Sequence, residues 1–167
     1  MPGEHTYDYA IIRVVPRVER GELINVGVIL SCPSADFLEA RIEIDAARLL
    51  ALDPTLDVEA TRAHLEMIPL VCRGGVEAGE IGALPQRSRF HWLVSPRSTI
   101  IQMSPVHTGR TDDPEKTLQR LLETMVRRGH RVTTVPLTKD SSPEDHPRIT
   151  RITQIKTGGG CVWRARR

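Results

Sequence analysis

Residues 7–30, YDYAIIRVVPRVERGELINVGVIL, decide the fold because they hold two apolar runs separated by a charged turn. The first run, residues 7–15, is rich in aromatic and β-branched side chains and stops at Pro16, which is typical of a strand. The second run, residues 23–30, is also mostly apolar and predicts a second strand. The segment between them is short and charged, so the two strands are expected to pair antiparallel.

A third strand is expected at residues 38–44, LEARIEI, where apolar and charged side chains alternate. The link at residues 31–37 is short enough for a hairpin, so the three strands form an antiparallel meander. Gly27 lies inside the second strand and predicts a bulge or a close approach by another backbone. Asn25 is the one polar residue in that strand that packing does not explain.

Two amphipathic helices are expected to provide the main packing partners of the sheet. Asp57 is a suitable N-cap for residues 58–68, and Pro69 is the expected stop. Asp113 and Pro114 begin the second helix, residues 114–128, in which leucines recur at helical spacing. A shorter helix is expected at residues 46–52.

The middle of the chain is harder to assign. Residues 73–86 contain four glycines and Pro85 and are therefore expected to be a loop. Residues 90–94, FHWLV, and 99–103, TIIQM, predict two strands joined by a type I turn. The expected fold class is α+β, an antiparallel sheet of about five strands with the two main helices packed on one face.

The length of 167 residues is enough for one α+β domain, residues 1–139, followed by a flexible basic appendage, residues 140–167. Residues 1–114 hold 11 basic and 16 acidic side chains, whereas residues 115–167 hold 12 basic and 5 acidic ones. The basic C-terminal third predicts, at most, weak attraction to nucleic acid.

Several classes of protein are excluded by missing motifs. The first 115 residues contain no lysine for a phosphate-binding P-loop, and no G-x-G-x-x-G, C-x-x-C or H-E-x-x-H motif occurs. No cofactor or metal is therefore expected. No apolar run is long enough for a membrane span, and the first nine residues do not form a signal peptide. Three widely spaced cysteines fit a reducing cytoplasm.

Polar side chains concentrate in residues 89–113, around two X-Pro turns. Arginines with nearby hydroxyls are the chemistry of an anion or phosphate site. The candidate ligands are Arg97, Ser98, Ser104, His107, Thr108 and Arg110. The other interpretation is that these groups pin loops and cap a helix. Trp92, between apolar neighbours, is expected in the core or at an interface.

The motifs Y-x-Y-x-x-x-R, P-R-x-E-R-G-E, N-V-G-V, P-R-S-T and S-P-V-H-x-G occur in residues 7–30 and 89–114. They resemble the bacterial family known as domain of unknown function 3037, over about residues 7–128. The family has no established activity, so the resemblance implies no catalytic residue. Its genes often neighbour those of HipA-like kinases, which implies an accessory or regulatory protein partner.

Two functions from different classes follow. The leading one is a non-catalytic accessory or regulatory protein of the bacterial cytoplasm, which would expose an apolar or arginine-rich patch to a partner such as a HipA-like kinase. The alternative is a small phosphate- or nucleotide-handling enzyme that uses the region from Arg97 to His107. No membrane association is expected for either.

Overall fold

The computed structural model describes residues 4–97, 99–127, 156–157 and 160–161. The chain divides into two units, Met1–His130 and Arg131–Arg167. In the second unit, β6 (Lys156–Thr157) pairs antiparallel with β7 (Gly160–Cys161). The rest of the predicted appendage at 140–167, like residue 128 at the end of the helix expected at 114–128, lies outside the described residues. The first unit carries the fold that follows.

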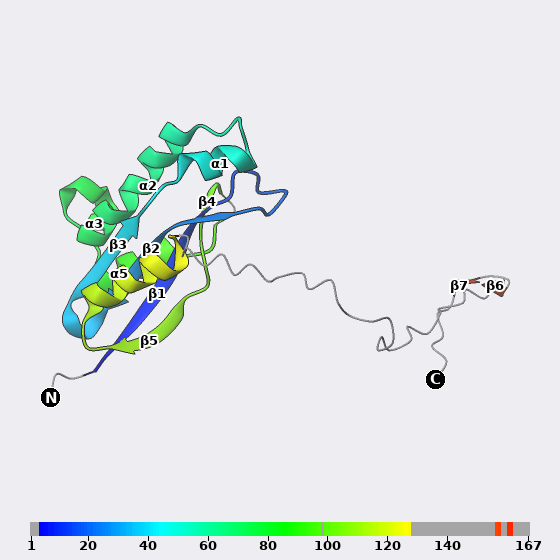
Figure 1. Cartoon of the computed structure of the whole chain (residues 1–167). Coiled ribbons are helices and arrows are strands. Elements are labelled where there is room, and N and C mark those ends of the chain that lie inside the picture. Colours follow the sequence, from blue (N-terminus) through cyan, green and yellow to red (C-terminus); the bar gives the residue numbers. More distant parts are fainter. Residues whose placement is uncertain (1–3, 98, 128–155, 158–159, 162–167) are drawn as a thin grey trace, which may run out of the picture. The chain divides into compact units, whose positions relative to one another are not determined.

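One strand, β1 (His5–Val14), organises the main sheet. It pairs antiparallel with β2 (Ile24–Cys32) along one edge, and β3 (Phe37–Ile42) pairs with β2. Along its other edge lie two short strands in succession, β4 (Ile101–Met103) and β5 (His107–Thr111). The five strands are labelled in Figure 1. The α+β class and the five-stranded antiparallel sheet are thereby confirmed.

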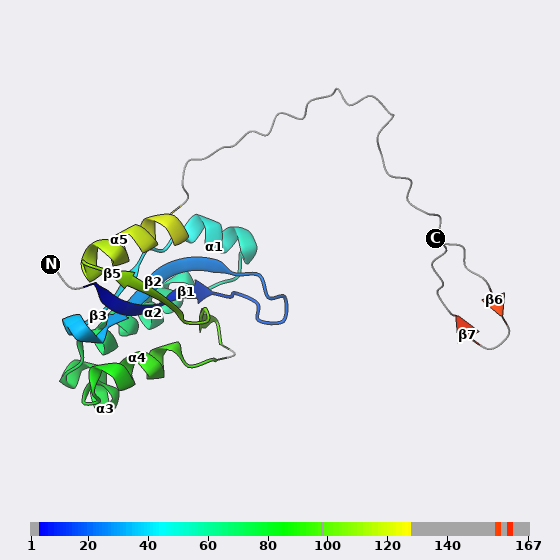
Figure 2. The same cartoon turned by 90° about the horizontal axis from the view of Figure 1, so that it is seen from below.

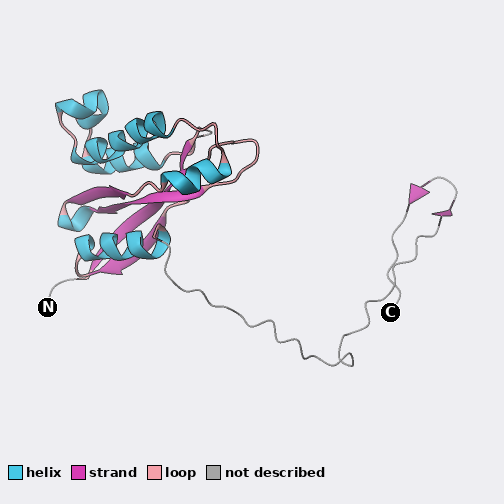
Figure 3. Ribbon diagram, turned by 45° about the horizontal axis from the view of Figure 1, so that its top comes forward, coloured by secondary structure: helices cyan, strands magenta, loops and turns pink. Residues whose placement is uncertain are grey.

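Helices cover both faces of this sheet, as Figures 2 and 3 show. One face packs against α2 (Val58–Arg73) and α4 (Gln86–Val94), and the other packs against α5 (Pro114–Met125). The expectation that both main helices share one face is wrong. The remaining helical elements are α1 (Ala46–Leu52), α3 (Gly79–Gly82) and the 3-10 turns η1 (Pro33–Ala35) and η2 (Val76–Ala78).

The alternation of side chains along the strands explains why two faces are covered. On β1, Ala10 and Ile12 point toward α2, whereas Tyr7 points toward α5. Eight of the nine residues of β2 are buried, which requires a hydrophobic layer on each side of the sheet. The run VGVIL, residues 26–30, is apolar at consecutive positions, which is the sequence pattern of a strand buried on both faces.

A bulge in β2 changes which residues face which helix. Ile12 pairs with Gly27, but the next residue of β1, Arg13, pairs with Asn25, so Val26 has no opposite partner. Ile24 and Val26 consequently pack with α2, and Asn25 faces α5.

Both sequence observations on this strand have a structural explanation. The Asn25 side chain donates a hydrogen bond from Nδ2 to the carbonyl of Met125, at 3.0 Å, near the end of α5. A Cβ atom on Gly27 would lie 2.6 Å from the backbone oxygen of Arg41 on β3. Gly27 therefore permits the close approach of two backbones, as the sequence predicts.

Three local predictions are wrong. Residues 90–94 are the second half of α4 rather than a strand, because Phe90 and Leu93 are three positions apart and both enter the core. Helix α2 continues through Pro69 to Arg73, with Val71 and Cys72 buried. The predicted loop at 73–86 contains η2 and α3.

Replacing Gly27 by alanine is expected to destabilise the fold by about 1–3 kcal/mol, because the new methyl group must displace the β3 backbone. Urea unfolding followed by circular dichroism measures this difference in the free energy of unfolding. A Gly27→Ala variant as stable as the wild type would contradict the close approach of β2 and β3.

Candidate functional site

A groove of about 810 Å³ opens between α2, α4 and β4. Its inner wall includes Ile68 and Val71 of α2 and Leu93 of α4, all of which are buried. Ile101 and Met103 of β4 line another part of the wall. The groove is therefore continuous with the core on the α2 face of the sheet.

The mouth of this groove is apolar as well. Nine large hydrophobic side chains are exposed among the described residues, and four of them line the groove: Val18 (43% exposed), Met67 (46%), Trp92 (38%) and Ile100 (44%). They come from four separate segments of the sequence. Single exposed hydrophobic residues are common on proteins, whereas several gathered around one concavity are a more unusual feature.

Arg97 shapes one end of the groove. Its guanidinium carbon lies 4.2 Å from the centre of the Trp92 ring, and its NH2 group donates to the Trp92 carbonyl at 2.9 Å. Ser95 donates from Oγ to the carbonyl of His91, at 2.7 Å. These two bonds satisfy carbonyls at the end of α4. Arg97 thus holds the Trp92 ring in place as a wall of the groove.

Ser104 has a structural position inside the sheet and is only 3% exposed. Its Oγ accepts a hydrogen bond from the backbone N–H of Ile11 at 2.8 Å and donates one to the Pro105 carbonyl at 2.8 Å. Its own N–H donates to the Ile11 carbonyl at 2.9 Å. The hydroxyl therefore completes the backbone ladder at the join between β4 and β5.

The other candidates lie along β5 and point to different faces of the sheet. The ring of His107 packs against Tyr9 with 5.2 Å between centres, on the α5 face. Thr108, one position on, faces the α2 side and donates from Oγ1 to Asp8 at 2.7 Å. Arg110 forms an ion pair with Glu4 at 3.1 Å.

The candidate anion ligands consequently do not meet in one pocket. Arg97 lines the groove, Ser104 is buried in the sheet, and His107, Thr108 and Arg110 are spread over β5. Ser98 lies outside the described residues. Each of the five described candidates already has a contact within the protein. Anion binding by these residues stays a prediction that the structure does not test.

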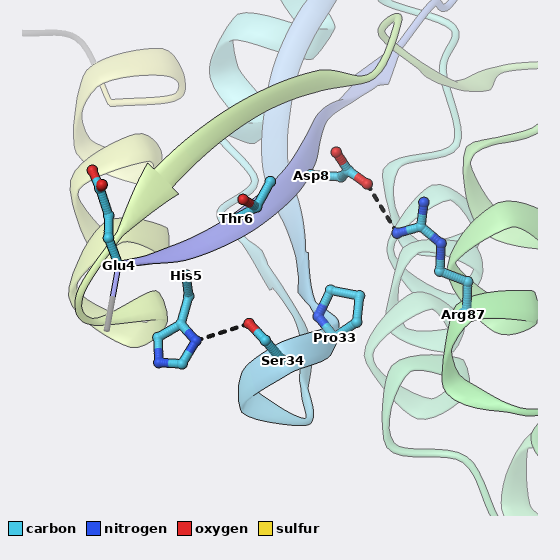
Figure 4. A pocket seen from close by; sticks show the side chains of 7 residues that line it. All are labelled: Glu4, His5, Thr6, Asp8, Pro33, Ser34 and Arg87. Atoms are coloured by element: carbon cyan, nitrogen blue, oxygen red, sulfur yellow. Dashed lines mark hydrogen bonds and ion pairs between the residues drawn. The ribbon is translucent and has the colours of Figure 1, made fainter. Parts of the chain in front are cut away.

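A smaller polar pocket lies at the start of β1, next to η1 and α4, and Figure 4 shows its seven lining residues. His5 Nδ1 lies 2.8 Å from Ser34 Oγ, and Arg87 donates to Asp8 at 3.0 Å. The Asp8 carboxylate points toward Arg87, away from His5, and its other oxygen accepts from Thr108. The histidine–serine pair thus has no support from Asp8 of the kind a catalytic triad needs.

Three further features bear on the chemistry of the described part of the chain. Burial raises the pKa of the Cys72 thiol to about 12, so the thiolate needed for nucleophilic chemistry does not form near neutral pH. Among the described residues, no three metal-ligating side chains cluster. Within the same residues, no helix has both the length and the apolar character needed to cross a bilayer.

These features define an α+β protein with a preformed apolar groove. Residues 9–126 match the family model described as "Protein of unknown function (DUF3037)". The chain therefore belongs to this family, as the sequence motifs indicate. No curated protein and no solved structure matches the chain.

The groove itself was not predicted from the sequence. Its lining comes from α2, α4, β4 and the β1–β2 connection, which are distant in sequence. The one available signal was Trp92, for which a core or interface position was expected. It lies at the groove and is partly exposed.

The hydroxyls of Ser104 and Thr108 provide a matched test of the structural interpretation. Ser104→Ala should cost about 1–3 kcal/mol of stability, because it leaves the buried N–H of Ile11 without a partner. Thr108→Ala should change stability by about 0.5 kcal/mol or less, because the Thr108 side chain is exposed and the Asp8 carboxylate still accepts the hydrogen bond from Arg87. Equal stability of the two variants in urea unfolding would contradict the structural role of Ser104.

Proposed function

We propose that the protein is a non-catalytic accessory protein of the bacterial cytoplasm that binds a partner protein in the groove between α2, α4 and β4. The observation that carries this proposal is the convergence of Val18, Met67, Trp92 and Ile100 on one preformed concavity. Side chains of this kind exposed together favour association, because binding removes their apolar surface from water.

The polar lining of the groove favours binding over catalysis. Its charged or titratable side chains are Asp57, His64 and Arg97. The Asp57 carboxylate accepts the N–H of Ala60 as the N-cap of α2, and Arg97 satisfies a carbonyl at the end of α4. Two of the three are thus engaged in hydrogen bonds that hold the walls of the groove.

A HipA-like kinase is the partner to test first. The chain belongs to the DUF3037 family, and the choice rests on what the resemblance to that family implies about its partner. Aromatic side chains such as Trp92 often dominate the binding energy of protein interfaces, which fits a groove that receives part of a larger partner.

Trp92 also provides the assay. The chain contains two tryptophans, so Trp163→Phe leaves Trp92 as the only indole. Titration of this variant with the HipA-like kinase from the same organism, labelled so that its own tryptophans do not contribute, should change the Trp92 emission as the groove is filled. A wild-type protein that shows no binding by calorimetry would contradict the kinase as partner.

Two charge-introducing variants test whether the groove is the surface used. Met67→Asp should weaken binding about tenfold or more, because the new carboxylate loses water when the groove is covered. Val76→Asp is the matched control, since Val76 is 96% exposed and does not line the groove. Equal affinities of the two variants, with both folded by circular dichroism, would place the partner elsewhere.

A further inference from the structure

One wall of the groove is the open edge of a strand. The hydrogen bonds from Val15 N–H to Ile100 and from Ser104 N–H to Ile11 frame the β1–β4 ladder. Backbone groups in an antiparallel ladder alternate between the two sides of each strand. The N–H and C=O of Gln102 therefore face Arg13 of β1, and those of the two neighbours of Gln102 face outward.

Among the strands that the structure describes, β4 is bonded to β1 alone, so these outward groups have no strand partner there. The Ile101 carbonyl accepts a hydrogen bond from Thr99 Oγ1 at 2.7 Å. In the described part of the chain, no hydrogen bond reaches the N–H of Ile101 or the N–H and C=O of Met103. Their side chains pack on the α2 face and line the groove. The apolar lining of the groove and the outward-facing backbone groups of Ile101 and Met103 thus lie next to each other.

The end of the groove at Arg97 adds a positive charge. The Arg97 side chain is exposed, uses its NH2 group on the Trp92 carbonyl, and has no carboxylate within ion-pair distance among the described residues. The remaining guanidinium N–H groups are available for a negatively charged side chain of the bound partner.

We propose that the groove binds an extended segment of the partner protein, which adds to β4 as an outer strand. The segment would place alternate apolar side chains between α2 and α4 and a carboxylate next to Arg97. This inference rests on the proposed function, because it specifies the conformation and charge of the partner segment.

An extended segment suits this wall better than a helix does. A bound helix keeps its backbone hydrogen bonds to itself, so it would cover Ile101 and Met103 without pairing their outward groups. A strand pairs with them and directs every second side chain into the groove. Three residues of β4 extend about 10 Å, so the contact involves a segment of about four or five residues.

A synthetic peptide tests this mode directly. The probe is a blocked octapeptide with valine at alternate positions, threonine between them and glutamate at both ends. Its binding is followed by Trp92 emission in the Trp163→Phe variant. Two derivatives are compared: one carries N-methyl groups on the amides of two valines, the other on the amides of two threonines. Because backbone N–H groups alternate between the two sides of a strand, only the valine amides or only the threonine amides can face β4.

Strand addition predicts that one methylated derivative binds about tenfold or more weakly, whereas the other stays within about twofold of the parent peptide. Replacing both glutamates by glutamine should weaken binding by several fold in the wild type and have less effect in Arg97→Gln.

Equal affinities of the two methylated derivatives would overturn the inference, since side chains alone would then account for binding. A parent peptide that does not bind at millimolar concentration would overturn it as well. Neither result affects the proposed function, which depends on the kinase titration and on the Met67→Asp and Val76→Asp variants.

Discussion

The strand β1 is the constraint on which the rest of the structure depends. Its side chains enter both hydrophobic layers, and its backbone is bonded along both edges. One edge belongs entirely to β2, whereas the other is divided between β4 and β5. Ser104 lies at the division, where its hydroxyl accepts the Ile11 N–H. A buried backbone N–H without a partner would cost about as much as a lost core methyl group or more.

The divided edge also determines where the groove lies. Near β5, Arg87 at the start of α4 forms an ion pair with Asp8 of the sheet. Thr108 donates a hydrogen bond to the same Asp8 carboxylate. Near β4 the end of α4 and its following turn leave space against α2, and this space is the groove. Polar side chains such as Arg97, Ser104 and Thr108 hold this arrangement together, and apolar side chains line the groove.

The sequence predicts those parts of the fold that are encoded locally. Periodicity identifies β1, β2 and β3, and the caps Asp57 and Asp113 mark the starts of α2 and α5. A five-residue apolar run such as FHWLV fits a strand and a buried helix equally well, and β5 has too few apolar residues to show alternation. Polar composition does not distinguish a hydroxyl that replaces a ladder bond from one that binds a ligand, so the sequence leaves both interpretations open for Ser104. The groove depends on contacts between distant segments, which periodicity does not reveal.

Amide hydrogen exchange of the free protein, resolved by residue with NMR, tests most directly that β1 is paired along both edges and that, among the described strands, β4 pairs with β1 alone. The account predicts slow exchange throughout residues 7–14 of β1 and at Gln102, whose N–H faces β1. It predicts much faster exchange at Ile101 and Met103, whose N–H groups face away from the sheet. Equal protection of Ile101, Gln102 and Met103 would contradict the open edge beside the groove.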